Sequence, residues 1–491
     1  ALMENQCFYI DKTDLIRQWW DSGDDVTLIT RPRRFGKTLN MSMLNCFFSN
    51  QYAGRSDLFE GLSVWNHEEY RQIQGTYPVL FLSFASVKAD NAADAKKQIK
   101  SRITSLYQDH EYLLEDEALN ESEKLAYRRL LTEMINMDDI TACDSLNHLC
   151  KYLTHVCGKK PVILLDEYDT PMQESYVYGY WEELTSFLRN LFNATFKTNT
   201  CLERAIMTGI TRVSKESMFS DLNNLNVVTT TSDQYAACFG FTKEEVSAAL
   251  AAFWMEDKEE EVKRWYNGFT FGSQKDIYNP WSITNYLDKK ELRPYWASTS
   301  SNGLVNKLLQ TASGEMKTML ESLLEGNRIT VNLDEQLAFN QLGQNENAVW
   351  SLLLAGGYLK AEHVEYRGIT REPWYTLSVT NLETISMFSN MFKGWFERSL
   401  SNYNGFLKAL LKDDVEAMNY YMNKVAMATF SYFDVGGGRV EDSEPERFYH
   451  GFVLGMMVEL SDRYVVTSNR ESGYGRYDVI LEPREQRNGW D

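Results

Sequence analysis

Arg31-Pro-Arg-Arg-Phe-Gly-Lys-Thr38 is the stretch that decides the fold of the first half of this chain. It follows an apolar run, Val26-Thr-Leu-Ile-Thr30, and precedes a segment with helical character at 39–48. A strand, a tight loop ending in Gly-Lys-Thr and a helix form a phosphate cradle, because loop amides and a helix N-terminus direct positive dipoles toward an anion. The alternative is a basic turn that simply precedes a helix.

The residues of this loop have separate expected roles. Gly36 lets the backbone approach a phosphate, Lys37 reaches the β- and γ-phosphates, and the Thr38 hydroxyl holds Mg²⁺. The general motif has glycine at the position of Arg31, so the first turn must form in another way, with Pro32 fixing part of the backbone. Six consecutive residues are predicted to bind the nucleotide: Arg33, Arg34, Phe35, Gly36, Lys37 and Thr38.

Composition limits the class of protein. A chain of 491 residues predicts two to four domains, and 43% hydrophobic residues are ordinary for globular protein. The net charge of −19 argues against a general nucleic-acid coat, so any DNA contact needs a local patch. Seven cysteines without a CxxC pair suggest neither a zinc knuckle nor a disulfide framework, which fits a reducing cytoplasm. No apolar run has membrane-spanning length and no signal peptide is visible, so no membrane partner is expected.

Strand-like and helix-like segments alternate in the first part. After the strand at 26–30, apolar runs at 78–84, 161–165 and 204–208 read as buried strands, with helical segments at about 92–152 and 189–198 between them. This order predicts a parallel, doubly wound α/β sheet of the P-loop NTPase class. Ligands of such sheets bind at the carboxyl ends of the strands, where the polar motifs fall.

One apolar strand ends in acids: Pro161-Val-Ile-Leu-Leu-Asp-Glu-Tyr-Asp169. In phosphate-loop ATPases the first acid at this strand end helps to hold hydrated Mg²⁺, and a following Glu polarises the attacking water. Asp166 and Glu167 fit these roles, and Asp169 is a candidate helper. The alternative is a strand end whose acids only face solvent.

The next buried strand ends in Met207-Thr-Gly-Ile-Thr-Arg212. Thr208 is the candidate sensor of the γ-phosphate, acting through the water. Arg212 is a candidate for stabilising charge on the phosphates, with a structural salt bridge as the equal alternative. The same two alternatives, a phosphate contact and a structural salt bridge, stay open for Arg33 and Arg34.

The rest of the chain has a different pattern of predicted elements. Thr242 and Glu245 form a capping-box pattern that opens a mainly helical region. Short helices followed by a hairpin-like stretch at 375–379 would suit a winged-helix module. Amphipathic helices run to about 431, a Gly-rich joint follows at 434–438, and a final unit has a helix at about 445–460 and strand-like runs at 464–467 and 477–481.

These motifs together resemble a known family. The residues that carry the resemblance are Tyr9-Ile-Asp-Lys-Thr13, Arg31–Thr38, Leu165-Asp-Glu-Tyr-Asp169, Thr208-Gly-Ile-Thr-Arg212 and Tyr278-Asn-Pro-Trp-Ser282. They look like the AAA-ATPase-like proteins of bacteria, which commonly carry a C-terminal PD-(D/E)XK nuclease-like domain. The Arg in place of the first loop Gly belongs to that family's own pattern.

The resemblance extends to the C-terminal segments 444–451 and 468–478. It implies that Glu444 or Glu446, together with Asp478, would be metal ligands of the nuclease fold, because clustered carboxylates gather Mg²⁺ and activate water. The family then needs a Glu-x-Lys on the next strand, and the sequence stops at Asp491 before that strand. The nuclease-like unit is therefore expected to be truncated and nuclease activity is not expected.

The resulting expectation is an AAA-like P-loop ATPase domain at 1–238, a helical lid at 239–297, a winged-helix-like module at 298–380 and a truncated nuclease-like domain at 381–491. The chain is expected to bind ATP with Mg²⁺ and to hydrolyse it slowly as a switch linked to nucleic-acid processing or defence. DNA, RNA or a protein are its candidate partners. The alternatives are a nucleotide-gated protein-interaction module without nuclease activity and a module that binds nucleotide without hydrolysing it.

Overall fold

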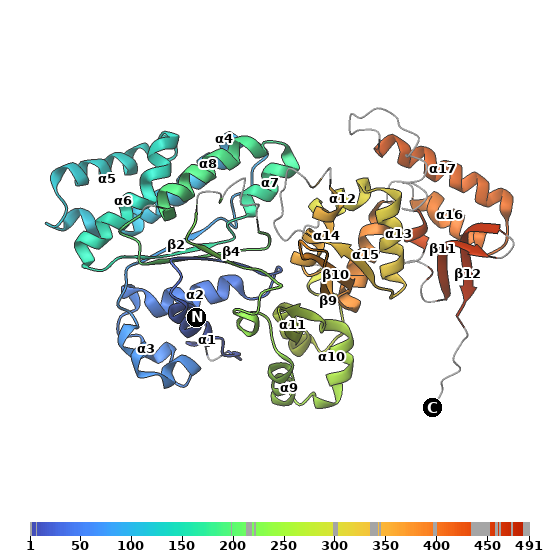
Figure 1. Ribbon diagram of the computed structural model, residues 1–491, viewed down its shortest axis with the longest axis horizontal. Coiled ribbons are helices and arrows are strands. Elements are labelled where there is room, and N and C mark those ends of the chain that lie inside the picture. Colours follow the sequence, from blue (N-terminus) through green and yellow to red (C-terminus); the bar gives the residue numbers. More distant parts are fainter. Residues whose placement is uncertain are drawn as a thin grey trace. The chain divides into compact units, whose positions relative to one another are not determined.

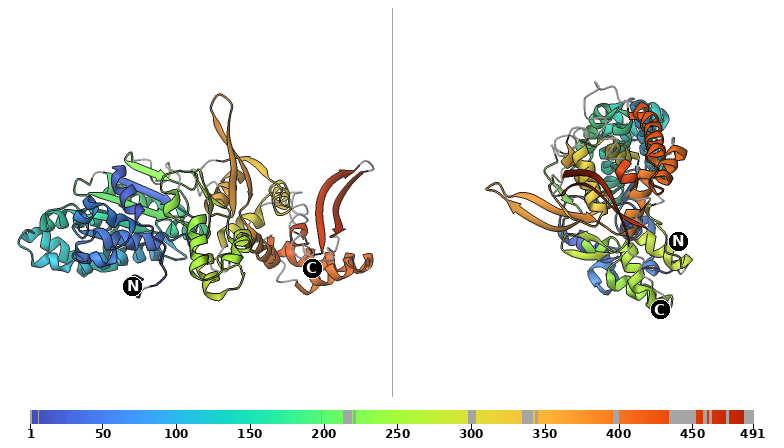
Figure 2. Two further views of the ribbon diagram at one scale, coloured as in Figure 1. Left: turned by 90° about the horizontal axis from the view of Figure 1, so that it is seen from below. Right: turned by 90° about the vertical axis from the view of Figure 1, so that its right-hand side faces the viewer.

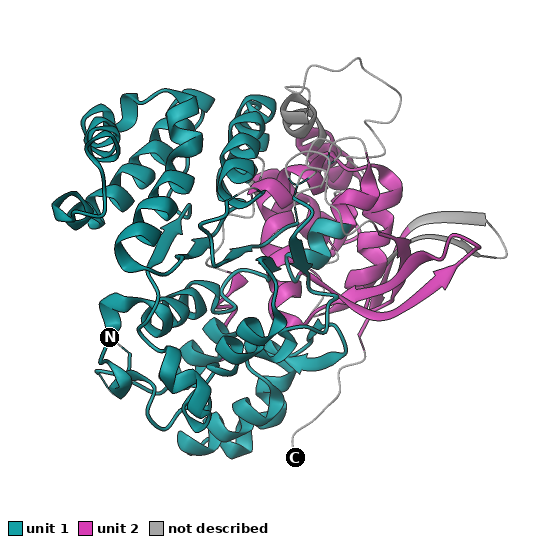
Figure 3. Cartoon of the chain, turned by 60° about the vertical axis from the view of Figure 1, so that its left-hand side comes forward, with its two compact units in different colours: residues 1–290, 334–342, 351–357 teal, residues 291–333, 343–350, 358–491 magenta. Residues whose placement is uncertain are grey.

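A computed structural model describes most of the chain, namely residues 2–5, 7–197, 199–212, 219, 222–297, 303–333, 342, 345–395, 400–433, 452–456, 460, 463–472 and 475–484. The chain divides into two compact units (Figure 3). Unit 1 comprises residues 1–290, 334–342 and 351–357, and unit 2 comprises residues 291–333, 343–350 and 358–491. The boundaries of the four predicted domains stay a prediction.

Unit 1 is built on a five-stranded parallel sheet with the order β2-β3-β4-β1-β5. Its strands are β1 (Val26–Thr30), β2 (Val79–Ser83), β3 (Val162–Asp166), β4 (Arg204–Gly209) and β5 (Leu225–Val228). The predicted parallel α/β sheet of a P-loop NTPase is thereby confirmed. Strand β4 lies between β1, which leads into the phosphate loop, and β3, which ends in the acids.

Helices cover both faces of this sheet (Figure 1). One face carries α1 (Asp14–Ser22), α2 (Lys37–Phe48) and α3 (Glu68–Ile73), and the other carries α4 (Ala92–Asp109), α6 (Asp139–Cys157), α7 (Thr170–Tyr178) and α8 (Trp181–Phe192), with α5 (Glu121–Glu133) next to α6. Strands β1 and β3 are buried along their whole length because both faces are covered, which explains their continuous apolar runs.

The helical stretch predicted at 92–152 is three separate helices. Each one begins at a residue whose side chain accepts a hydrogen bond from a backbone N–H of the first turn: Asn91 for α4, Asn120 for α5 and Asp138 for α6. Such N-caps satisfy amides that have no partner inside the helix. The long segment breaks where these caps occur.

The remainder of unit 1 contains α9 (Lys243–Ala252), α10 (Glu259–Tyr266), a β6–β7 hairpin (Phe269–Phe271 and Gln274–Ile277) and α11 (Pro280–Lys289). The predicted capping box is confirmed, since the Thr242 side chain accepts from Glu245 N while the Glu245 side chain accepts from Thr242 N. The short hairpin was not predicted within this helical region.

Unit 2 contains helices α12 (Gly303–Thr311), α13 (Gly314–Leu324), α14 (Glu346–Ala355), α15 (Leu382–Trp395), α16 (Leu400–Leu410) and α17 (Val415–Phe433), of which α14 is shared with unit 1. Strands β8 (Ile329–Asn332), β9 (Leu359–Arg367) and β10 (Glu372–Val379) form an antiparallel sheet, and the β9–β10 hairpin extends well beyond the helices of its unit (Figure 2). Strands β11 (Tyr464–Ser472) and β12 (Gly475–Pro483) pair with each other. The winged-helix interpretation stays a prediction.

The described residues cover only part of the predicted nuclease-like unit. Glu444, Glu446 and the Gly-rich joint at 434–438 lie outside the described residues. Asp478 lies on β12, but its side chain is outside the described part of the structure.

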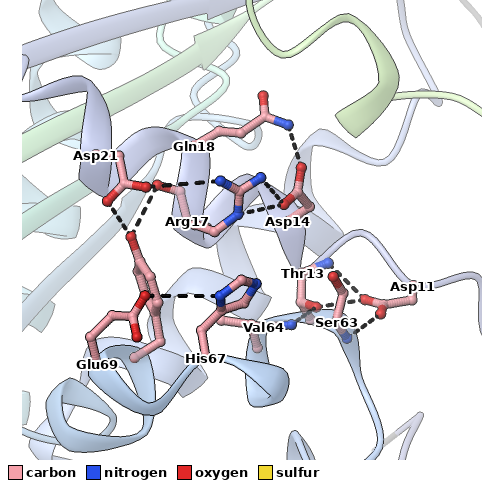
Figure 4. A network of polar contacts seen from close by, with 11 residues as sticks. Asp11, Thr13, Asp14, Arg17, Gln18, Asp21, Ser63, Val64, His67 and Glu69 are labelled. Atoms are coloured by element: carbon pink, nitrogen blue, oxygen red, sulfur yellow. Dashed lines mark hydrogen bonds and ion pairs between the residues drawn. The ribbon is translucent and has the colours of Figure 1, made fainter.

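The Tyr9-Ile-Asp-Lys-Thr13 motif forms a polar network near the start of α1 (Figure 4). Asp11 accepts hydrogen bonds from Thr13 N at 2.8 Å, Thr13 Oγ1 at 2.7 Å and Ser63 N at 2.6 Å. Thr13 Oγ1 also accepts from Val64 N at 3.1 Å. The network fastens the segment at 63–66 to the start of the first helix.

The Lys12 side chain of the same motif contacts a different part of unit 1. Its Nζ lies 2.7 Å from Glu245 Oε1 and 2.8 Å from the Ala237 carbonyl oxygen. Glu245 is also the capping-box residue of α9. The N-terminal motif therefore holds the helical region at 239–290 against the start of the chain, which is a structural role.

We expect Thr13→Val to destabilise unit 1. The substitution keeps the volume of a fully buried side chain but leaves the Val64 amide without its acceptor, at a cost of about 1–3 kcal/mol. For a domain of this size the midpoint of thermal unfolding should fall by about 2–4 °C per kcal/mol. The matched control is Thr104→Val, because the buried Thr104 hydroxyl only donates to the Lys100 carbonyl of its own helix. An equal shift in the two variants would contradict the proposed role of the network.

Candidate nucleotide site

The loop at 31–38 has the backbone of a phosphate cradle. Gly36 has φ of 80° and is the N-cap of α2, while Arg34 has φ of 65°, a left-handed conformation that is unusual for a residue with a Cβ. Arg34, Thr38 and Leu39 are exposed. One face of the loop is therefore open, next to the N-terminus of a twelve-residue helix.

Lys37 is buried beneath this loop. Its Nζ donates to the carbonyl oxygens of Arg31 at 3.2 Å and Pro32 at 3.1 Å, and it lies 3.4 Å from Glu167 Oε1. The side chain thus spans the loop from below and forms an ion pair with Glu167.

Asp166 joins three elements at the carboxyl end of the sheet. Its Oδ2 accepts from Thr38 Oγ1 at 2.7 Å and its Oδ1 accepts from Thr208 Oγ1 at 2.6 Å. Burial raises the pKa of this carboxyl group, while the two hydroxyl groups oppose the shift. The structure thus brings Thr38, Asp166 and Thr208 together around one carboxylate.

Glu167 directly follows Asp166 but has a different environment. Its backbone is left-handed, with φ of 53°, and its side chain is 20% exposed next to Lys37. The turn at Glu167 separates the two carboxylates, so that Asp166 faces the hydroxyl groups and Glu167 faces the ammonium. A strained conformation at such a site is typical of residues with a functional role.

Arg31 explains how the loop begins without the usual glycine. Its fully buried guanidinium donates from Nη1 to the carbonyl oxygens of Thr30 at 2.9 Å and Thr229 at 2.7 Å, and from Nη2 to Gln234 O at 3.3 Å. It also stacks over the Phe271 ring at 4.6 Å. Burial lowers the pKa of Arg31 to about 9, so the group stays charged at neutral pH. Arg31 fastens the first turn to the segment at 229–239, whereas the sequence analysis had named only Pro32 as fixing part of this turn.

Phe35 and the Tyr278-Asn-Pro-Trp-Ser282 motif support the loop from the helical region. The Phe35 ring is buried against Phe269 at a centroid distance of 4.7 Å, so only its backbone can contact a phosphate.

Asn279 caps α11 by accepting from Trp281 N at 2.9 Å and donates to the Arg33 carbonyl at 3.4 Å. The Arg34 guanidinium stacks over the Trp281 ring at 4.6 Å. The pattern Asn-Pro at a helix start could have predicted this cap, but its contact with the loop could not be read from sequence.

Asp169, the candidate helper, is fully buried beyond the acidic pair. Its Oδ2 accepts from Ile210 N at 3.0 Å, Thr211 N at 2.9 Å, Thr211 Oγ1 at 2.8 Å and Gln173 Nε2 at 3.0 Å. Gln173 Oε1 accepts from Arg33 Nη2 at 3.3 Å. Sequence analysis did not find Gln173, although its spacing of four residues from Asp169 on a helix is a signal for such a contact.

Arg212 lies three residues beyond the end of β4, close in sequence to this group. Its side chain is half-buried, and no described residue forms an ion pair with it. The structural salt bridge considered from sequence is therefore not seen within the described ranges. Asp478 belongs to unit 2, whereas the residues around Asp166 belong to unit 1.

Comparison with known proteins supports the same assignment for part of the chain. Residues 1–219 match the family described as a predicted AAA-ATPase, and residues 444–490 match the PD-(D/E)XK nuclease superfamily. Residues 1–219 are thus similar to predicted AAA-ATPases. The resemblance read from the motifs is thus confirmed for both segments.

One relative comes from Azotobacter chroococcum mcd 1, where it is described as an uncharacterized protein in the vnfD 5' region. It is 27% identical over 378 residues, which cover 77% of this chain and 64% of the relative. The chain therefore spans less than two thirds of that relative's length. The similarity extends well beyond the AAA-ATPase-like segment.

Among the described residues, no group of three or more His, Cys, Asp or Glu side chains is placed to hold a metal ion. No helix in the described ranges combines the length and apolar character needed to cross a membrane.

We expect Arg31→Lys to destabilise the loop despite its conserved charge. Lysine lacks the planar fork that reaches three carbonyl oxygens and cannot stack on Phe271 in the same way. The loss should be about 2–4 kcal/mol, seen as a lower midpoint of thermal unfolding. Arg129→Lys is the matched control, because Arg129 is exposed and pairs only with Glu133 among the described residues; its change should stay within about 0.5 kcal/mol. Indistinguishable midpoints for the two variants would show that the buried fork is not needed.

Proposed function

We propose that this chain binds ATP with Mg²⁺ at the loop 31–38 and hydrolyses it slowly, as a switch. The observation that carries the proposal is the meeting of Thr38, Asp166 and Thr208 around one buried carboxylate, beside the phosphate loop. Each of these side chains comes from a different element, namely α2, β3 and β4. A purely structural strand end would not need this convergence.

The residues present fit the nucleotide and the cation. Amides of the loop and of the start of α2 would bind the phosphates, with the Lys37 ammonium as the point charge. The Thr38 hydroxyl and Asp166 would hold Mg²⁺, which would supply positive charge next to the phosphates. The side chains of Arg33 and Arg34 border the same loop and remain candidates for phosphate contacts.

Glu167 is the proposed residue that orients the attacking water. In the structure it lies 3.4 Å from Lys37, and phosphate binding by Lys37 would release it from this pairing. Thr208 would sense the γ-phosphate, and Arg212 would stabilise negative charge that develops on it. The reaction then needs both a loaded loop and a released Glu167.

We further propose that the switch acts on nucleic acid, in processing or defence. Support comes from the match of residues 444–490 to the PD-(D/E)XK nuclease superfamily. The alternative is a nucleotide-gated protein-interaction module without nuclease activity, which the net charge of −19 favours. Binding of labelled duplex DNA and RNA, measured with and without ATP, separates these two proposals. ATP-dependent binding supports the nucleic-acid switch, and the absence of such binding supports the protein-interaction module.

Lys37→Ala should weaken ATP binding by about 10- to 100-fold, because a hydrogen bond to a charged phosphate group is lost. Titration with a fluorescent ATP analogue measures the effect. Lys97→Ala is the control, because Lys97 is exposed and pairs with Asp94 on α4. Equal affinity in wild type and Lys37→Ala would refute the assignment of the loop.

Glu167→Gln should preserve ATP affinity within about threefold and lower turnover by about 10²-fold or more, the usual scale for the loss of a general base. Phosphate release under saturating ATP is the measurement. Glu115→Gln removes an exposed carboxylate elsewhere in the same unit and should have no effect. Unchanged turnover in the Glu167 variant would contradict its proposed role.

A further inference from the structure

The segment after β4 is held on both sides by two consecutive residues of the acidic motif. The Tyr168 hydroxyl donates to the Thr211 carbonyl oxygen at 2.7 Å, and Asp169 Oδ2 accepts from the Thr211 amide and hydroxyl and from the Ile210 amide. Gly209 makes this approach possible. A Cβ there would lie 2.6 Å from the Tyr168 ring and 2.7 Å from Asp169 Oδ1.

The same carboxylate is connected to the phosphate loop. Gln173 donates from Nε2 to Asp169 Oδ2 at 3.0 Å and accepts from Arg33 at 3.3 Å. A continuous chain of hydrogen bonds thus runs from Arg33 through Gln173 and Asp169 to Thr211, the residue before Arg212. It connects the loop that would bind phosphates with the segment that carries the half-buried Arg212.

Burying the Asp169 carboxylate costs more free energy than a purely structural hydrogen-bond link would require. Burial is the main cause that raises its pKa, and the charge of Glu167 adds to the shift. Its second oxygen, Oδ1, is buried and has no hydrogen-bond partner among the described residues. A neutral amide could accept from the same backbone groups with a smaller loss of hydration, since a buried charge that is only partly satisfied is costly. Such cost is typical of positions kept for function.

We propose that Asp169 is a positioning residue that couples γ-phosphate binding at the loop to the placement of Arg212. The relay Arg33–Gln173–Asp169–Thr211 fixes the backbone before Arg212, so that its guanidinium faces the γ-phosphate only when the loop is occupied. This inference rests on the proposed ATP function, and it adds that the protein distinguishes ATP from ADP through Asp169.

The test compares a nucleotide that lacks the γ-phosphate with one that carries it. Dissociation constants for ADP and for the β,γ-imido analogue of ATP, both with Mg²⁺, are measured by calorimetry on the full chain. Wild type should bind the analogue more tightly than ADP. Asp169→Asn should reduce this preference by about 10-fold while changing ADP affinity by less than about threefold, because only the contact to the γ-phosphate is misplaced.

Three further variants separate positioning from simple support. Gln173→Ala should reduce the preference in the same direction, and it keeps the test available if Asp169→Asn does not fold. Glu174→Gln neutralises the neighbouring carboxylate on α7 and should leave the preference unchanged. In the double variant Asp169→Asn/Arg212→Ala the loss should equal that of Arg212→Ala alone, since residues that act through one another are not additive.

The possible results are distinguishable. A wild-type preference that persists in Asp169→Asn and Gln173→Ala would overturn the inference while leaving ATP binding intact. Parallel losses of ADP and analogue binding, or additive losses in the double variant, would show that Asp169 only supports the fold and would also overturn it. Failure of the wild type to bind either nucleotide would contradict the proposed function itself, and the inference with it.

Discussion

The buried Asp166 carboxylate is the interaction on which the candidate site depends. It accepts hydrogen bonds from Thr38 at 2.7 Å and Thr208 at 2.6 Å, and so connects the first turn of α2 with the ends of β3 and β4. The strand order places β4 between β1 and β3, so this one group bridges the distance from the phosphate loop to the acidic strand. Because the hydroxyl groups oppose the rise in pKa that burial causes, they help to keep the carboxylate ionised for a cation.

The four consecutive polar residues of the acidic motif, 166–169, make different contacts. Asp166 faces the hydroxyl groups, Glu167 turns to Lys37 through a left-handed backbone, and Tyr168 and Asp169 hold the segment before Arg212. The division follows from geometry, because successive residues after a strand point in different directions. A single short sequence therefore supplies the proposed cation ligand, the proposed water-orienting group and the clamp on the next loop.

Sequence predicted the parallel sheet and the elements of the site because both rest on local patterns: apolar runs that fill a strand, and polar residues that follow them. It also predicted the capping box at Thr242. It could not predict that Arg31 would be buried on the carbonyl oxygens of Thr229 and Gln234, since that contact joins residues about 200 positions apart and the same arginine would suit a solvent-facing turn equally well. The contact of Asn279 with the loop is long-range for the same reason. The β6–β7 hairpin was missed because its strands are only three and four residues long.

The most direct test of the account is a crystal structure of the chain with Mg²⁺ and a non-hydrolysable ATP analogue. We expect the β-phosphate on the amides of residues 33–38, Mg²⁺ between Thr38 and Asp166, and the Lys37 ammonium turned from Glu167 to the phosphates. A nucleotide bound at another place, or a loop in which Lys37 keeps its pairing with Glu167 while Mg²⁺ lies away from Asp166, would contradict the central claim.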